Sequence, residues 1–398
     1  MDSFIVTKEY LHNLSQQWSS DTIRQRRQLH ASPELSFRET KTAAFIQTCL
    51  TKWGISWKTM AGTGVVAHIH GEGSGKSCVA VRADIDALPI QQDSCQPYIS
   101  QQPGVMHACG HDAHTASLLT TARMLQHCRS QFGGTIKLIF QPGEEVLPGG
   151  ASLLINEGVL EDPKPDCILA LHVQPQLQAG HIALRGGAHM ASMDELRFII
   201  RGKGGHAAQP HTLIDPVYTA AQLIIALQQV VSRKANPASP TVLSIGRIVA
   251  DGAINIIPHE VTLEGTLRCF DEEWRSRAHE WIKQTATAIA AASGATCETI
   301  IRLGYPVLKN DIAVANRIKV LAGEFLGEKQ VEEAPIWMAA EDFASYIQQV
   351  PGCFYLLGVR NESKGITAGL HTPQFDLDEE VLHFSPALMT WLALGMLK

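Results

Sequence analysis

The sequence predicts an α/β protein with two domains. Short apolar segments of strand length alternate with segments of helical periodicity through the first half of the chain, as is typical of a largely parallel sheet with helices on its faces. At 398 residues the chain is long for one hydrophobic core, and its middle section follows a different element order. We therefore expect a larger α/β domain that is interrupted by a smaller one.

The larger domain is expected to begin with two helices. The first runs from about Asp21 to the Ser-Pro pair at 32–33, and the second has Ser36 as its N-cap and Glu39 completing a capping box. Strands are then expected at 64–70, 78–83, 135–141 and 167–173, and helices at 113–127 and 150–157. In such sheets the residues that carry the chemistry follow the carboxyl ends of the strands.

The element order changes after Gly187. Strands are expected at 194–201, 241–249, 260–270 and 296–302, with a helix that Asp215 and Pro216 open and another at 272–292. This βαββαβ order is ferredoxin-like. From Asp311 onward α/β elements resume and end in a helix near 378–397. Residues 1–186 and 306–398 are therefore expected to form the larger domain, and residues 187–305 the inserted one.

Composition excludes several classes of partner. The net charge is −6 without a basic block, which argues against binding to nucleic acid or to an anionic membrane surface. The N-terminal residues lack a basic segment followed by an apolar run, and no apolar stretch reaches membrane-spanning length. Nine cysteines are scattered singly, which fits a reducing compartment. We therefore expect a cytoplasmic protein.

The stretch from His107 to His114 contains three histidines, a thiol and a carboxylate within eight residues. Such side chains bind first-row divalent metals or orient the ligands that do. Cys109 and His111 are separated by one glycine and do not form the paired units of a structural zinc site, so further ligands must come from elsewhere. Taken alone, the stretch fits a polar loop that opens a helix equally well.

Further candidate residues follow the predicted strands, including Asp84, Asp86 and the Glu144-Glu145 pair. The candidate ligands are Cys109, His111, Glu145, His172 and the distant His371. Five ligands exceed what one catalytic zinc needs, so two ions about 3.5–4 Å apart fit better. Singly, each ligand also fits a solvated loop or a core histidine, but their joint placement at strand ends favours a metal site.

The paired glutamates suggest a division of roles, because one carboxylate can hold metal while Glu144 takes a proton from water as general base. In the inserted domain, His206 lies in a glycine-rich segment and could donate to a developing oxyanion. Asn255 and Arg268 could bind a substrate carboxylate. Read alone, these three residues equally fit an exposed turn histidine, a turn residue and an edge-strand charge.

Eight segments together carry a family resemblance: residues 27–36, 82–89, 107–114, 140–145, 205–208, 255–258, 340–343 and the loop around His371. They span almost the whole chain. With them, the sequence resembles the metal-dependent amidohydrolases that include hippurate hydrolase, N-acyl-amino-acid amidohydrolases, N-acetyldiaminopimelate deacetylase and the plant indole-acetyl-amino-acid hydrolases. The resemblance implies a zinc-exopeptidase-like mixed sheet flanked by helices, with the inserted domain serving as a lid and dimerisation domain.

The resemblance also implies roles for individual residues. It implies that the five candidate ligands hold a dinuclear centre and that Glu144 is the general base. His206 would lie on the lid and stabilise the oxyanion, often across a dimer interface, while Asn255 and Arg268 would contact substrate. Asp84, Asp86 and Asp112 would support the ligands from behind. The ions are expected to be zinc or manganese, with cobalt or nickel as alternatives, because thiolate, imidazole and carboxylate suit all four.

The expected reaction is hydrolysis of an N-acyl-L-amino acid, such as an N-acetyl or N-benzoyl derivative, to a carboxylate and a free amino acid. A dipeptidase, a carboxypeptidase or an N-acetyldiaminopimelate deacetylase would use the same chemistry on another substrate. A non-catalytic binding protein on this fold is a further alternative, although the intact glutamate pair argues against it.

Overall fold

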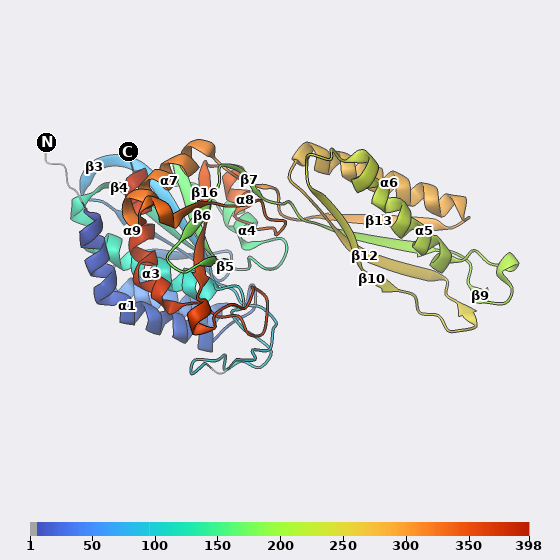
Figure 1. Ribbon diagram of the computed structural model, residues 1–398, viewed down its shortest axis with the longest axis horizontal. Helices are drawn as coiled ribbons and strands as arrows, with labels where there is room; N and C mark the ends of the chain where they lie inside the picture. Colours follow the sequence, from blue (N-terminus) through green and yellow to red (C-terminus); the bar gives the residue numbers. More distant parts are fainter. Residues whose placement is uncertain (1–5, 95, 398) are drawn as a thin grey trace. The chain divides into compact units, whose positions relative to one another are not determined.

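The computed structural model describes residues 6–94 and 96–397, which divide into two compact units (Figure 1). The first unit comprises the chain up to His189, Lys309–Pro335 and the chain from Asp342 onward. The second unit comprises Met190–Leu308 and the short segment Ile336–Glu341. The inserted domain was expected at 187–305, and the sequence did not indicate that the short segment would join it.

The first unit is built on an eight-stranded mixed sheet with strand order β1-β2-β4-β3-β5-β16-β6-β15. Its strands are β1 (Trp57–Met60), β2 (Gly64–His70), β3 (Gly73–Asp84), β4 (Gly133–Gln141), β5 (Cys167–Gln178), β6 (Ile182–Leu184), β15 (Val331–Glu333) and β16 (Gly352–Arg360). The central strands β4, β3, β5 and β16 are parallel, β2 and β6 run antiparallel to the central strands beside them, and β1 runs antiparallel to β2. The carboxyl ends of the central strands therefore meet at one edge.

Helices cover this sheet (Figure 1). They are α1 (Lys8–Ala31), α2 (Thr40–Lys52), α3 (His111–His127), α4 (Gly150–Asn156), α7 (Ile312–Leu326), α8 (Ala344–Ile347) and α9 (Ser385–Met396), with short helical turns η1 (Arg129–Gln131), η4 (Glu328–Gln330), η5 (Glu362–Lys364) and η6 (Glu379–His383). Alternate residues of β3, such as Val79 and Val81, enter one hydrophobic core with Leu118 of α3 and Leu388 of α9. The last seven residues of β3 are all buried, as expected for a central strand with both faces covered.

The second unit is a four-stranded antiparallel sheet with strand order β10-β12-β8-β13. Its elements are β8 (Asp194–Arg201), β9 (Gly205–His206), η2 (Pro210–Thr212), α5 (Pro216–Gln229), η3 (Val230–Lys234), β10 (Thr241–Val249), β11 (Ile256–Ile257), β12 (Glu260–Cys269), α6 (Glu272–Ala292) and β13 (Thr296–Leu303). Leu223 of α5 and Ile282 of α6 pack with Phe198 of β8 in a separate core. This is the predicted ferredoxin-like βαββαβ arrangement. Two further strands, β7 (Gly187–Met190) and β14 (Leu308–Asn310), form a small sheet of their own.

Two predictions about the first helices are wrong. Helix α1 begins at Lys8, with Thr7 as its N-cap, because Leu11, Leu14 and Trp18 continue the buried face well before Asp21. Helix α2 begins at Thr40 without a side-chain cap.

The capping box fails because both of its side chains bind elsewhere. The Ser36 hydroxyl donates to Asp86, and the Glu39 carboxylate accepts from the backbone N–H groups of Phe37 and Gly143. The predicted C-terminal helix is likewise divided, into η6 and α9.

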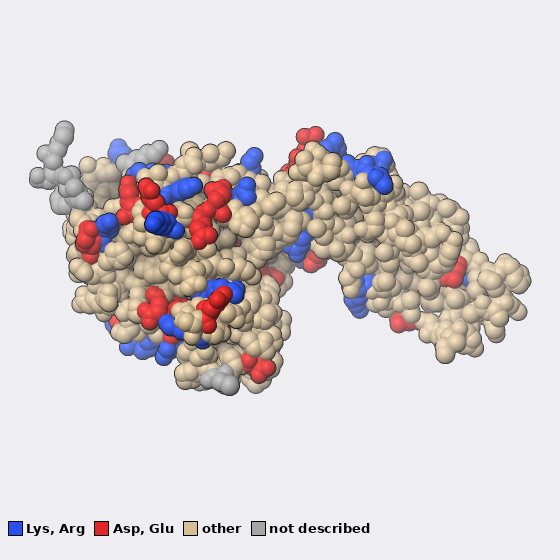
Figure 2. Space-filling model, viewed as in Figure 1, with Lys and Arg blue, Asp and Glu red and all other residues tan. Residues whose placement is uncertain are grey.

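Acidic and basic side chains are interspersed on the visible face of the first unit (Figure 2). None of the helices among the described residues combines the length and the apolar character that crossing a lipid bilayer requires.

Candidate metal centre

The predicted metal ligands lie together at the carboxyl edge of the first unit's sheet. Cys109 and His111 flank the turn that opens α3, Glu145 follows β4, His172 lies in β5 and His371 lies in a loop after β16. The Cys109 Sγ atom lies 3.4 Å from Nε2 of His172 and 3.3 Å from Nε2 of His371. Oε1 of Glu145 lies 3.3 Å from Nε2 of His371 and 3.9 Å from Nε2 of His111.

These donor atoms form two overlapping groups. One comprises Cys109, His111 and His172, the other Cys109, Glu145 and His371, and within each group the donor atoms lie within 4.8 Å of one another. Cys109 belongs to both groups. The Glu144 carboxylate lies within the same distance of His111 and Glu145 donors, so the adjacent acid is beside the cluster.

Two donor atoms at the centre of the cluster have no hydrogen-bond partner among the described residues, although they are buried. They are Nε2 of His111 and Oε1 of Glu145. Buried polar atoms are normally hydrogen-bonded, because burying them without a partner costs about 1–3 kcal/mol each. Imidazole, thiol and carboxylate atoms directed at one small volume fit a divalent metal ion, which would satisfy both atoms.

The electrostatics of the cluster also favour a cation. Burial lowers the pKa of His111, but the carboxylates of Asp84 and Asp86 outweigh burial and raise the pKa to about 10. Burial raises the pKa of the Cys109 thiol, and the carboxylates of Glu145 and Glu144 raise it further. The pocket therefore favours positive charge on its imidazole and opposes negative charge on its thiol, and a bound divalent cation would offset both effects.

Asp86 contacts His111 through the ring nitrogen that does not face the cluster. Oδ1 of Asp86 lies 3.2 Å from Nδ1 of His111, and its Oδ2 accepts from the Ser36 hydroxyl and the Glu145 backbone N–H. This contact occupies the Nδ1 side of the His111 ring and directs Nε2 toward the other donors. On His172, Nδ1 donates to the Val173 carbonyl over 2.7 Å, which leaves Nε2 facing Cys109.

The other polar residues of the opening stretch are also buried, and the ring centre of His114 lies 4.8 Å from that of His172. His114 uses both ring nitrogens, with Nδ1 2.6 Å from Asp84 and Nε2 accepting from the Val173 N–H. Asp112 accepts from Nε of Arg26 and lies 2.8 Å from Nδ1 of His30, and neither of these partners is a candidate ligand. His107 is buried, and burial lowers its pKa to about 4.

Two backbone positions in the centre require unusual geometry. Gly110 has φ +81°, and a Cβ atom there would lie 2.4 Å from Cγ2 of Val173. Glycine is therefore required between Cys109 and His111, since any side chain would be both strained and overlapping. His371 has φ +59°, which is uncommon for a residue with a side chain, and its backbone N–H is held by the Ala108 carbonyl.

Three of the predicted residues belong to the second unit. His206 is exposed on β9, paired with Ile256 of β11, and the neighbouring Asn255 carbonyl accepts from the Ala207 N–H. His206 and Asn255 are therefore close together. Arg268 lies eight residues beyond the start of β12, and its Nη1 donates to the Met338 carbonyl. It is not beside the other two residues.

Sequence reasoning gave no role to Arg82, although it is fully buried within β3. Its guanidinium donates to Asp84 over 2.6 Å and to Asp342 over 2.8 Å. It thereby fixes the carboxylate that contacts both His114 and His111. The sequence feature that could have indicated this role is a single arginine within the otherwise apolar strand predicted at 78–83.

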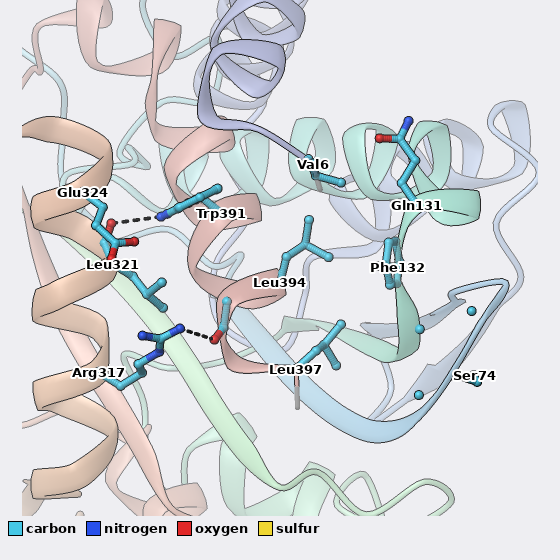
Figure 3. A pocket seen from close by; sticks show the side chains of 14 residues that line it. Val6, Ser74, Gln131, Phe132, Arg317, Leu321, Glu324, Trp391, Leu394 and Leu397 are labelled. Carbon is cyan, nitrogen blue, oxygen red and sulfur yellow. Dashed lines mark hydrogen bonds between the residues drawn. The ribbon is translucent and has the colours of Figure 1, made fainter. Parts of the chain in front are cut away.

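A cavity of about 590 Å³ lies elsewhere in the first unit (Figure 3). Phe132, Leu394 and Trp391 line it, and the Trp391 indole N–H donates to the Leu321 carbonyl over 2.9 Å. Gly73 and Gly133, which also line it, begin β3 and β4, whereas the metal cluster follows the ends of these strands. The cavity is therefore at the opposite edge of the sheet from the cluster.

A mixed sheet with thiol, imidazole and carboxylate donors at its carboxyl edge fits a metal-dependent hydrolase that acts on amide bonds. The chain belongs to peptidase family M20/M25/M40, whose profile matches residues 80–392.

Three relatives illustrate this membership. An N-acetyl-L-cysteine deacetylase of Bacillus subtilis is 40% identical over 358 residues, covering 90% of this chain and 83% of the relative. Thermostable carboxypeptidase 2 of Saccharolobus solfataricus is 37% identical over 376 residues, covering 94% of each chain. The crystal structure of Bacillus subtilis YXEP, described as a dinuclear metal binding peptidase of the M20 family, has a TM-score of 0.82 at 36% identity over 96% of this chain and 99% of that one.

Proposed function

We propose that this protein hydrolyses the amide bond of N-acyl-L-amino acids, releasing a carboxylate and a free amino acid. One observation carries the proposal: the donor atoms of Cys109, His111, Glu145, His172 and His371 converge at the sheet edge with the Glu144 carboxylate beside them. The N-acetyl-L-cysteine deacetylase relative supports this substrate class.

The proposed roles follow from the chemistry of each side chain. When bound to the five ligands, two divalent ions would polarise the scissile carbonyl and lower the pKa of the attacking water. Glu144 accepts a proton from that water as the C–O bond forms, and delivers it to the amide nitrogen as the C–N bond breaks. Asp86 keeps Nε2 of His111 directed at the cluster. We assign oxyanion stabilisation to His206 and contact with the substrate to Asn255 and Arg268.

We propose zinc or manganese as the ion, with cobalt and nickel as the other candidates. The Cys109 thiol favours zinc, whereas the surrounding carboxylates also suit manganese. Metal analysis of the purified protein, followed by chelation and reconstitution with each ion separately, distinguishes them. The proposal expects two equivalents of metal per chain.

We further propose that the second unit is a lid and dimerisation domain. Helix α5 exposes 58% of Tyr218 and 74% of Ile225, and its surroundings carry few charged side chains in the visible face (Figure 2). Apolar side chains exposed to this extent on one helix favour a covered interface. Ile225→Glu is expected to give monomers by light scattering, whereas Ile312→Glu, at a similarly exposed position in the first unit, leaves the dimer intact.

A cytoplasmic location is also part of the proposal. Each cysteine that the structure describes is unpaired, which fits a reducing compartment. Cell fractionation tests this location.

Metal-dependent release of amino acids from N-acetyl, N-benzoyl and indole-acetyl substrates tests the reaction. Glu144→Gln is expected to lower kcat by about 10²–10⁴-fold while metal content stays unchanged, because the base is lost but the ligands remain. Wild-type activity in a folded Glu144→Gln protein would contradict the mechanism. The carboxypeptidase relative supports a second candidate, and cleavage of dipeptides alone would favour it.

A further inference from the structure

A buried arginine behind the metal cluster joins segments that carry two of the candidate ligands. Arg26 of α1 is fully buried, and its Nε donates to Oδ2 of Asp112 over 2.8 Å. Its Nη2 donates to Oδ1 of Asp376 over 2.8 Å, and its Nη1 donates to Oε1 of Glu379 over 3.1 Å. One guanidinium therefore pairs with three carboxylates that come from two distant parts of the chain.

The position of two of these carboxylates along the chain is informative. Asp112 directly follows His111 in the first turn of α3, and Asp376 follows His371 by five residues at the end of the same loop. The two candidate ligands belong to different donor groups of the cluster. Arg26 thus ties the segment that carries one ligand to the segment that carries the other.

The conformation of the His371 loop depends on contacts of this kind. The His371 side chain is 51% exposed and its backbone has φ +59°, so packing does little to hold it. An unusual backbone conformation persists where surrounding contacts determine it. Tyr98 adds to these contacts, because its hydroxyl donates to Oδ2 of Asp376 over 3.1 Å while Arg26 lies 4.8 Å from the centre of its ring.

Stability alone does not explain why this region contains a buried network of ion pairs. Buried ion pairs contribute little net stability compared with apolar residues of similar volume, since both charges lose their hydration. They do impose a specific geometry, because the fork of a guanidinium bonds carboxylates in fixed directions. Two ligands that come from distant segments must be held at a fixed spacing to bind metal ions together.

We propose that Arg26 is a positioning residue that holds His111 and His371 at the spacing that two metal ions need, acting through Asp112 and Asp376. The inference rests on the proposed dinuclear centre. The hydrogen bonds of the Arg26 guanidinium go to Asp112, Asp376 and Glu379, none of which is a candidate ligand.

The first test measures metal affinity by competition with a chelator, in Arg26→Lys and Asp376→Asn. Residues that orient metal ligands typically change affinity by about 10–100-fold, so a loss of this size for one of the two ions is expected. Arg275→Lys is the matched control, because Arg275 is also buried and pairs with Asp194 and Glu272, but in the second unit. It should lower the melting temperature without changing metal affinity.

A double-mutant cycle separates positioning from general stability. If Asp376 acts through the His371 loop, Asp376→Asn weakens metal binding in the wild type but has no further effect in a His371→Ala background. An equal loss of affinity in both backgrounds would overturn the inference. Should Arg26→Lys fail to fold, Tyr98→Phe removes only one hydrogen bond to Asp376 and is expected to give a smaller loss of the same kind.

The outcomes also separate this inference from the proposed function. A wild-type protein that binds no metal after reconstitution would overturn both. If the wild type binds two ions and Asp376→Asn binds them with unchanged affinity, the positioning role of Arg26 is overturned while the proposed function stands.

Discussion

Asp86 combines three contacts in a single buried carboxylate. It lies 3.2 Å from Nδ1 of His111 and accepts from the Glu145 N–H and the Ser36 hydroxyl. It thereby links one candidate ligand to the backbone of another. A side chain of this kind determines ligand geometry without touching the metal.

Replacing Asp86 with alanine is therefore expected to weaken metal binding by about 10–100-fold, because His111 loses the group that orients its ring. Chelator competition monitors the affinity. Ser36→Ala removes only the outer hydrogen bond to the same carboxylate and serves as the control, with a smaller expected effect. Equal effects of both substitutions would contradict the orienting role.

Gly110 allows a second test at a single position. Gly110→Ala is expected to destabilise the protein by about 1–3 kcal/mol more than Gly62→Ala, measured by urea unfolding, because both glycines have positive φ but only Gly110 faces a neighbour. The φ values are +81° and +79°, and a Cβ at Gly62 meets nothing within 4 Å, whereas one at Gly110 overlaps Val173. Similar losses at both sites would show that the overlap relaxes without cost.

The five candidate ligands could be predicted from the sequence because each follows, or lies in, a recognisable strand or motif. The contacts of Asp112 could not. Adjacent residues on a helix point about 100° apart, so Asp112 faces Arg26 although His111 faces the cluster. Nothing in the order of residues shows that Arg26, far earlier in the chain, lies behind this helix.

At the scale of elements, the sequence predicts strands better than helix starts. The bounds of β2, β8, β10 and α6 agree with the predicted ranges, since apolar periodicity and turn residues delimit them. The start of α2 differs because the Glu39 carboxylate accepts from Phe37, Gly143 and Thr63 instead of capping its own helix. Such a long-range contact outweighs the local capping preference.

Glu39 consequently connects the start of α2 with the loop that carries Glu144. Glu39→Ala would leave buried donors without partners, at about 1–3 kcal/mol each, and would free the backbone at Gly143. We expect a lower urea midpoint and a lower kcat at saturating metal. Thr63→Val removes only one of these hydrogen bonds and should retain kcat, so a similar loss of kcat in both variants would count against the connection.

On the scale of the whole molecule, each unit has its own core and its own buried ion network. In the second unit, Asp194 lies 2.5 Å from Nη2 of Arg275 and 2.6 Å from Nε2 of His279. Burial raises the pKa of Asp194, but hydrogen bonds from Arg275 and His279 outweigh burial and lower the pKa from 3.8 to about 2.

This lowered pKa predicts acid sensitivity of the second unit. Because the folded state holds the proton more weakly than the unfolded state, the ionised Asp194 contributes about 2 kcal/mol above pH 4, and this is lost as the pH falls toward 2. Urea unfolding between pH 5 and pH 2 measures the slope. Asp194→Asn should reduce that slope, and an unchanged slope would contradict the assignment.

The position of β16 has a consequence for the order of synthesis. This strand lies between β5 and β6 in the sheet, yet its residues 352–360 follow the whole second unit in the chain. A nascent chain on the ribosome can therefore complete the ferredoxin-like unit while the larger sheet still lacks a central strand. Cys109, His111, Glu145 and His172 emerge early, but the set of five donors exists only after His371 has been translated.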